Sequence, residues 1–448
     1  MALHLMLYTC LLVASPPQLA SDGAISEKLP FNLHGYLETL YRYRSQRGET
    51  DHDSEQFFSL RFSDKEKKWV EGYISARFAQ DLDGFNKAEP FAAFPDTFGR
   101  TYQRVTAAYV DVTCPLKIIE KVRLGRQELP ELPFMIRFDG VRLRTSVLDP
   151  IFKSRFSCFA GIPDHLGERS RGGDRLFGGS LRIEPFDLVN LSCSYVRLCD
   201  TYRIHDPLGS ASRKRSQDDL FIFSVSKSIW QNVSLSGRLC LLEGKARDAQ
   251  IRTQFYLPSL RCGLVASYKA LFKTQEERSA ELDPYVSVLR VYRPYHQFSV
   301  QAWHDLNEKI SLEAGFTVRR LKRAEHPGPF NHEFERYWAG IALMRWPFEG
   351  LEIDLIGELY ETGSDRHSEV EAAARYHFME NLLAEIGTAY ALFKEDRYTL
   401  RERSDVRAVF ANLKWQALPS LGVFCRYTFE EDNSQGSHLL EVALRWRF

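Results

Sequence analysis

The sequence lacks the features of two large classes of protein. Its 448 residues carry 59 Lys and Arg against 59 Asp and Glu, so the formal net charge is zero. A protein whose main role is to bind nucleic acid needs a basic footprint, which this balance does not provide. After the N-terminal region no stretch reaches the roughly 18 consecutive apolar residues of a membrane-spanning helix. The sequence therefore predicts neither a nucleic-acid-binding protein nor a bundle of membrane helices.

The cysteines and histidines form no recognisable metal or haem motif. Eight cysteines are spread along the chain without a CxxC pair or a CxxCH haem-attachment sequence, and the histidines do not cluster at metal-ligand spacing. Cys10 lies in an N-terminal apolar run, whereas Cys262 and Cys425 fall on the apolar side of alternating stretches. We interpret the cysteines as small apolar residues on strands, with disulfides as the alternative. No metal or other cofactor is predicted, and no GxSxG elbow or other catalytic arrangement suggests an enzyme.

What the chain does have is alternation, most clearly in residues 437–448. Every second residue there is apolar, and the chain ends on an aromatic residue: Leu440, Val442, Leu444, Trp446 and Phe448. The residues between them are mostly charged, which is the period-two pattern of a strand with one apolar and one polar face. Such an ending is similar to the closing strand of bacterial outer-membrane β-barrels. This likeness implies that Trp446 and Phe448 form the signal that the barrel-assembly machinery reads.

The rest of the chain repeats this pattern from Phe31 onward. We expect strands to start near Phe152, Gln217 and Pro284, among others, and the last of these to run to His304 with a kink at Pro294. Tight connections such as Leu148-Asp149-Pro150 alternate with longer, charged ones, the latter being 82–100, 161–173, 201–216, 274–283 and 321–332. Outer-membrane barrels show this asymmetry between short periplasmic turns and longer outer loops. The sequence predicts an all-β fold, a transmembrane antiparallel up-and-down β-barrel of about 22 strands, with 18 to 22 as the range.

The domain organisation follows from this interpretation. The apolar run Leu3–Ala14, followed by small residues, predicts a signal peptide over residues 1–24, although no Lys or Arg precedes it. Residues 25–448 are expected to form a single barrel domain in the bacterial outer membrane, with outer-membrane lipid around it. A soluble β-sandwich of this length would fall into several domains, and no shift in composition marks a boundary.

One segment resembles a known family. The run Val122-Arg123-Leu124-Gly125-Arg126-Gln127 lies between an AYVDV strand and a DGVRL strand. This arrangement resembles strands of the large porin-like barrels related to the alginate-export family. The resemblance implies an Arg-rich pore wall and a polysaccharide substrate, whereas the segment Leu129–Ile136 departs from the family pattern.

The polar faces of the strands provide the candidate site residues. The basic candidates for the pore lining come from the first half of the chain: Arg123, Arg142, Arg144 and Arg155. The acidic ones come from the second half: Glu352, Asp354, Glu358, Glu369, Glu371 and Glu385. Two walls of opposite charge would set up a field across the lumen. The alternative is that these charges pair with neighbours on adjacent strands.

Two functions remain open at this point. The first is a porin-like channel for passive or selective passage of small hydrophilic or anionic solutes. The second is a sleeve around a periplasmic partner, such as a multihaem cytochrome in an electron conduit. The chain lacks haem motifs, so it would form only the sleeve.

Overall fold

The computed structural model describes residues 31–448 except 47, 67–68, 84–100, 115–117, 131, 133–135, 165–172, 186–188, 206–210, 231, 274–292, 323–332, 363–365, 397–400 and 434. Within these limits the chain is almost entirely β-strand. The predicted signal peptide, residues 1–24, lies outside the described residues. No helix in the described part is long and apolar enough to cross a membrane.

Twenty-two strands follow one another along the chain. Their bounds are β1 (Phe31–Gln46), β2 (Glu49–Asp64), β3 (Val70–Asp81), β4 (Thr101–Thr113), β5 (Ile119–Glu128), β6 (Arg137–Thr145), β7 (Arg155–Pro163), β8 (Arg175–Ile183), β9 (Val189–His205), β10 (Ala211–Trp230), β11 (Val233–Leu242), β12 (Lys245–Leu257), β13 (Cys262–Leu271), β14 (Tyr295–Asp305), β15 (Ile310–Leu321), β16 (Phe334–Met344), β17 (Leu351–Glu361), β18 (Arg366–Met379), β19 (Leu382–Asp396), β20 (Arg401–Leu418), β21 (Leu421–Glu431) and β22 (Gly436–Arg447).

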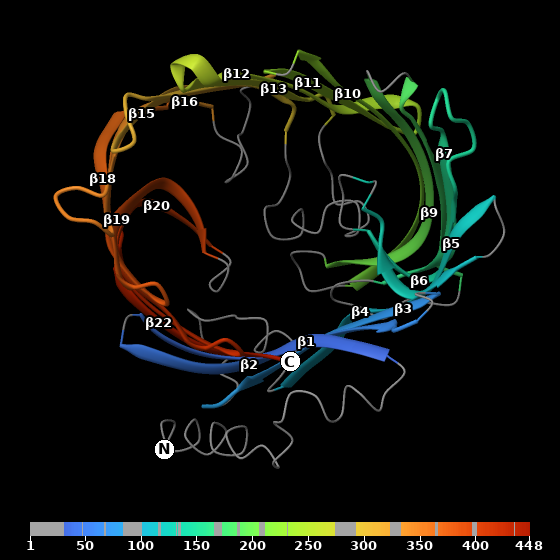
Figure 1. Cartoon of the computed structure of the whole chain (residues 1–448), viewed down its shortest axis with the longest axis horizontal. Coiled ribbons are helices and arrows are strands. Elements are labelled where there is room, and N and C mark those ends of the chain that lie inside the picture. The colour runs from blue at the N-terminus through green and yellow to red at the C-terminus, as the bar shows by residue number, and fades with distance from the viewer. Residues whose placement is uncertain are drawn as a thin grey trace.

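The strands close into one barrel. Each strand pairs antiparallel with the next, and β22 pairs with β1, from Gln46 opposite Ser437 to Tyr36 opposite Arg447. Figure 1 shows the resulting ring, in which the first and last strands lie side by side. The ladder continues to the last residue, because Gly35 and Phe448 exchange two backbone hydrogen bonds of 2.8 and 3.1 Å. The prediction of a 22-stranded antiparallel barrel is confirmed.

The longest connections all lie at one end of the barrel. One end, the short-connection end, holds the turns that precede β11, β19 and β21 and also the C-terminus. At the other, the long-connection end, longer stretches of sequence separate β3 from β4, β13 from β14 and β15 from β16. Transmembrane barrels have short turns on the periplasmic side and longer loops outside, so the long-connection end faces the exterior.

Three expected strand starts are corrected by the structure. β7 begins at Arg155 rather than near Phe152, because the Asp149 side chain accepts hydrogen bonds from the backbone N–H groups of Ile151 and Phe152 and holds them in a turn. β10 begins at Ala211 rather than near Gln217, so pairing with β9 extends into the expected loop 201–216. β14 begins at Tyr295, just after Pro294, and the expected earlier part of that strand falls mostly outside the described residues.

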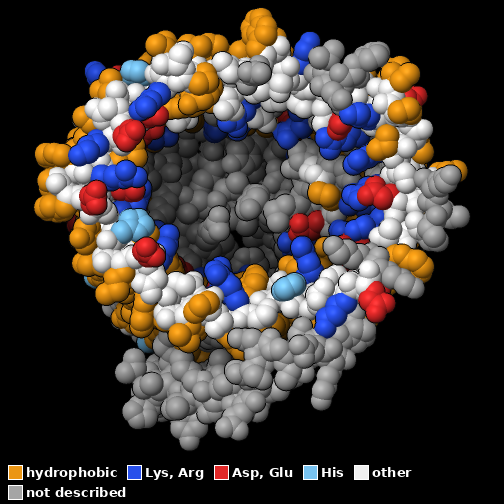
Figure 2. All heavy atoms as spheres, in the orientation of Figure 1, with side chains coloured by type: hydrophobic (Ala, Val, Ile, Leu, Met, Phe, Trp, Pro, Cys, Tyr) orange, Lys and Arg blue, Asp and Glu red, His pale blue; other side chains and the backbone are white. Residues whose placement is uncertain are grey.

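The register divides the side chains into an inner and an outer set. On β22, Glu441 and Arg445 lie opposite Arg42 and Glu38 on one face, whereas Leu440, Val442 and Leu444 lie on the other. Figure 2 shows charged side chains gathered around the central hollow and apolar side chains around the outside. The apolar side chains of β22, which the sequence analysis placed on one face, therefore point outward. A closed barrel with an apolar exterior satisfies every strand hydrogen bond and can span a bilayer. The chain is a bacterial outer-membrane β-barrel.

The inner face is not polar throughout. An inward-facing buried cluster occupies the part of β6–β11 nearest the long-connection end, and its members are Leu129, Leu132, Ile136, Phe138, Phe159, Leu176, Val196, Leu198, Leu220, Ile222, Cys240 and Leu242. Three of them, Leu129, Leu132 and Ile136, belong to the segment between β5 and β6. These strands are apolar on both faces here, because these three residues pack against the inner wall.

The assignment of faces predicts a difference between two adjacent positions in the middle of β17. Leu355 lies on the outer face and Ile356 on the inner face, opposite Glu371. We expect Leu355→Arg to destabilise the folded barrel by about 2–4 kcal/mol, the cost of an arginine at the bilayer midplane. We expect Ile356→Arg to cost far less, because carboxylates surround it. Unfolding by urea in lipid vesicles measures both, and equal costs would refute the assignment.

The terminal aromatic residue can be tested separately for assembly and for stability. Deleting Phe448 removes its two backbone hydrogen bonds to Gly35 and the ring that packs on that glycine. If Phe448 is also read by the assembly machinery, the variant should be lost in cells but should still refold in detergent, with modestly reduced stability. Heat-modifiable electrophoretic migration measures folding in both settings. Normal amounts of folded variant in the outer membrane would contradict the predicted signal.

Candidate functional site: the charged inner wall

The register places every predicted pore-lining residue on one face of the wall. Arg123 lies opposite Arg142 and Asp111, and Glu352 and Glu385 lie opposite Arg375, all on the inward side. The full inward-facing set is Arg123, Arg142, Arg144, Arg155, Glu352, Asp354, Glu358, Glu369, Glu371 and Glu385. Figure 2 shows charged side chains on this inner surface. Their action on a passing solute stays a prediction.

Two of the predicted arginines make bidentate contacts with carboxylates on neighbouring strands. Arg123 makes a bidentate contact with Asp111 at 2.7 and 2.9 Å, and its guanidinium lies 3.7 Å from the centre of the Tyr109 ring. Arg144 makes a similar contact with Glu120 at 3.1 and 2.7 Å. Bidentate pairs fix the guanidinium plane. These two arginines are therefore held rigidly, and much of their charge is compensated within the wall.

Arg142 and Arg155 have a more basic environment. Arg142 is buried and lies directly opposite Arg123, one inward position from Arg144 on β6. Like charges directly opposite each other repel, and Asp111, the partner of Arg123, offsets part of this repulsion. Arg155 lies opposite Arg182, whose own partner is Glu184 at 2.7 Å. We call these strands, β5–β7, the basic arc.

Several acidic residues of β17–β19 pair with the same arginine side chain. The guanidinium of Arg375 contacts Glu385 at 2.9 Å, Asp354 at 2.7 Å and Glu352 at 3.5 Å. One arginine thus bridges three carboxylates from two strands. Arg336, on the adjoining β16, pairs with the buried Glu358. We call β17–β19 the acidic arc.

Two further carboxylates of the acidic arc extend this surface. Glu369 lies directly opposite Glu358, and Glu371 is the next inward position on β18. Glu371 accepts a hydrogen bond from the backbone N–H of Tyr390 at 3.1 Å. Six inward carboxylates therefore share the arc with the two arginines just named, so acidic charge predominates among these residues.

The two arcs lie on opposite sides of the barrel. In Figure 1, β5–β7 occupy one side of the ring and β18 and β19 the other. Charges of opposite sign on facing walls create a transverse field, which orients dipoles and separates ions according to charge. This geometry arises only when the sheet closes, since the two arcs are distant in sequence.

An ion-pair network near the seam was not predicted from the sequence. Arg42 contacts Glu441 at 3.0 Å and Glu55 at 2.7 Å, and Glu55 also contacts Arg77 at 2.6 Å. This chain of contacts joins β22, β1, β2 and β3 across the point of closure. The alternation in these four strands places all four groups inward, but only the register shows that they meet.

The same region holds the acidic group that best matches a metal-binding arrangement. Asp51, Asp81 and Asp83 each offer an oxygen within 4.8 Å of the others. Arg44 already pairs with Asp51 and contacts Asp53 at 2.7 Å. The nearby guanidinium competes with a cation for these oxygens, and we assign no metal here.

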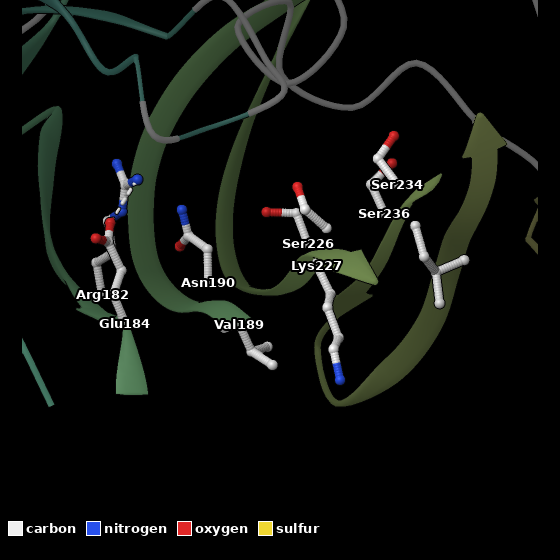
Figure 3. A pocket seen from close by; sticks show the side chains of 10 residues that line it. Arg182, Glu184, Val189, Asn190, Ser226, Lys227, Ser234 and Ser236 are labelled. Atoms are coloured by element: carbon white, nitrogen blue, oxygen red, sulfur yellow. Dashed lines mark ion pairs between the residues drawn. The ribbon is translucent and has the colours of Figure 1, made fainter. Parts of the chain in front are cut away.

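Hydroxyl groups line the inner wall near the short-connection end. Small polar side chains lie opposite one another across β9, β10 and β11: Ser226 lies opposite Asn190 and Ser236, and Ser228 opposite Ser234. They border a hollow of about 370 Å³. In Figure 3 the side chains of Asn190, Ser226 and Ser234 project to one side of the wall, and Lys227 projects to the other. The corresponding signal in the sequence is the run of serines at alternate positions, Ser224, Ser226 and Ser228, followed by Ser234 and Ser236.

The comparisons with known proteins agree on the fold. No family model matches the chain, and no curated protein does, so the likeness to the alginate-export family remains a sequence resemblance. Two solved structures from Pseudomonas aeruginosa are similar to this chain. The ferric enterobactin receptor PfeA (R480A mutant) is 8% identical, with 93% of this chain and 81% of that chain covered and a TM-score of 0.53. The siderophore receptor PirA is 10% identical, with 93% and 80% covered and a TM-score of 0.52.

A third structure, OccAB4 of Acinetobacter baumannii, aligns with nearly the full length of both chains. It is 10% identical, with 95% of this chain and 100% of that chain covered, but its TM-score of 0.45 is too low to support an argument. At these identities the two receptors show the architecture alone. The chain shares the large antiparallel barrel of these proteins, and its function has to be argued from its own inner wall.

Proposed function

We propose that the protein is a porin-like outer-membrane channel that admits small hydrophilic solutes and favours anionic ones. The observation that supports this most directly is the pair of opposed arcs on the inner face. Arg142 lies opposite Arg123 and one inward position from Arg144, so basic side chains gather on this part of the wall. A channel gains an attractive surface for anions.

The serine-lined hollow fits the same function. Hydroxyl groups at the short-connection end offer exchangeable hydrogen bonds to a hydrated solute without binding it tightly. Conduction requires sites that are favourable enough to enter and weak enough to leave. The inner wall combines such hydroxyls with the stronger charges of the basic arc.

The first test of the proposal is to measure the conductance of the purified barrel in a planar lipid bilayer. A channel should give discrete, ohmic current steps, because ions pass through the lumen of the folded barrel. A correctly folded barrel that passes no ions would contradict the proposal. Such a result would favour the alternative function, a sleeve around a periplasmic partner such as a multihaem cytochrome.

The basic arc predicts a specific change in ion selectivity. The variant Arg142→Gln, Arg144→Gln and Arg155→Gln should shift the reversal potential in a salt gradient toward cation preference, because three inward positive charges are removed. The shift should be larger at 0.01 M salt, where the Debye length is about 30 Å, than at 1 M, where it is about 3 Å.

Matched variants on the acidic arc provide the control. Glu369→Gln with Glu371→Gln removes two inward carboxylates from the opposite wall and should shift the potential toward anion preference. Arg320→Gln, on the outer face, should leave it unchanged. If the arginine variant folds and its selectivity is unaltered at both salt concentrations, the arginines do not act on permeating ions.

A further inference from the structure

Among the described residues, the outer face carries three hydrogen-bonded Tyr–His pairs. In each, a tyrosine hydroxyl lies within hydrogen-bond distance of the Nδ1 atom of a histidine on the adjacent strand. The pairs are Tyr41–His52 at 2.7 Å, Tyr268–His296 at 2.6 Å and Tyr427–His438 at 2.8 Å. Their registers place all six side chains outward, on the face of Leu440 and Val442 rather than of the charged arcs.

Each imidazole also lies beside a second aromatic ring. The His52 ring is 5.1 Å from that of Tyr43, the His296 ring 6.4 Å from that of Phe272, and the His438 ring 4.9 Å from that of Phe429. The same three-ring arrangement therefore occurs at three separate places on the barrel. Aromatic contacts on one side and a hydrogen bond on the other fix the orientation of each histidine.

The pairs lie at one depth, toward the long-connection end. Tyr268 and Tyr427 are each the seventh residue of a strand that ascends from the short-connection end. Tyr41 is the seventh residue counted from Gly35, where the ladder with Phe448 begins. The three histidines all lie within the first few residues of descending strands. Equal strand rise per residue gives the three pairs a similar height on the wall.

Two further tyrosines join the same band. Tyr195, again the seventh residue of its strand, donates to Asp219 at 2.7 Å, and Arg197 contacts the same carboxylate. Tyr337 donates to Glu335 at 2.7 Å, and Glu335 also pairs with Arg320. These groups are outward as well. The band therefore extends over much of the circumference.

The composition of the outer face changes at this band. Below the tyrosines it is apolar, with Leu264 and Ala266 under Tyr268, and Val423 and Cys425 under Tyr427. Above them polar residues appear, such as Arg197 and Glu431. An aromatic girdle between an apolar and a polar zone marks a membrane interface. Because the band lies toward the long-connection end, this is the interface of the outer leaflet.

Each Tyr–His pair leaves one donor unused. Within the described part of the chain, the Nε2 atoms of the three histidines have no hydrogen-bond partner. If the tyrosine donates to Nδ1, the proton of the neutral ring is on Nε2; if Nδ1 donates, the tyrosine hydroxyl keeps its own proton to give. In either tautomer an N–H or O–H donor faces the surrounding membrane. At the membrane interface this donor is available to an acceptor group of the surrounding lipid.

We propose that this band, the Tyr–His pairs together with Arg197 and Arg320, binds the phosphate groups of outer-leaflet lipid headgroups. A phosphate ester offers strong acceptor oxygens at the depth of the band, and donors to charged oxygens form the stronger class of hydrogen bond. The acyl chains of the same lipid then cover the apolar wall beneath. This binding does not depend on solute passage, so it can be tested whether or not the barrel conducts ions.

The test measures lipid binding to the folded barrel in detergent. Native mass spectrometry counts bound dioleoyl phosphatidic acid and, in parallel, dioleoylglycerol, which has the same chains without phosphate. The wild-type protein should retain phosphatidic acid preferentially. Replacing the three histidines and their three tyrosines by Phe keeps the rings but removes the donors. The dissociation constant at each site should rise about tenfold, as expected for losing one hydrogen bond to a charged group.

A matched control lies on the same face at the opposite end. His304 is outward, near the short-connection end of β14. His304→Phe should leave phosphatidic acid binding unchanged. If the six-substitution variant does not fold, variants of single pairs should each remove part of the binding. The proposal is overturned if wild type binds both lipids equally, or if the folded variants bind phosphatidic acid like wild type.

Discussion

Closure of the backbone ladder is the constraint on which the rest of this structure depends. A sheet edge inside a bilayer would leave N–H and C=O groups without water, at a cost of several kcal/mol for each group. Pairing of β22 with β1 removes that edge, and the pairing extends to the terminal residue. Gly35 makes this possible, because a Cβ there would lie 2.8 Å from the Phe448 ring and 2.4 Å from the carbonyl oxygen of Ser59.

Once the ring is closed, the two faces of each strand have different solvents. Outward positions must be apolar, and inward ones can carry charge if neighbours compensate it. The inner wall meets this condition mainly by pairing across strands, as Arg123 does with Asp111 and Arg375 with Glu385. Basic side chains gather around Arg142 and acidic ones around Glu369, and this distribution gives the wall its electrostatic character. This charge distribution on the inner wall is the feature of the fold on which the proposed channel function rests.

The outer face shows a comparable division along the barrel axis. Apolar side chains cover the wall up to the band of tyrosines, where hydrogen-bonded partners such as His296 and Asp219 appear. A tyrosine suits this depth because its ring is apolar and its hydroxyl is polar. The band of tyrosines thus indicates where the membrane interface lies, independently of the loops.

The sequence alone determined the architecture, because alternation with period two is a local property that each strand displays separately. It gave the strand number, the outward set on β22 and the inward parity of all the charged candidates. It could not show which of those charges meet, since Arg42 and Glu441 come together only through closure. Nor did parity reveal the inward apolar cluster around Phe138 and Leu176, which depends on a segment folding against the inner wall. Pairing, burial and the opposition of the two arcs are decided by register and curvature, which are properties of the whole ring.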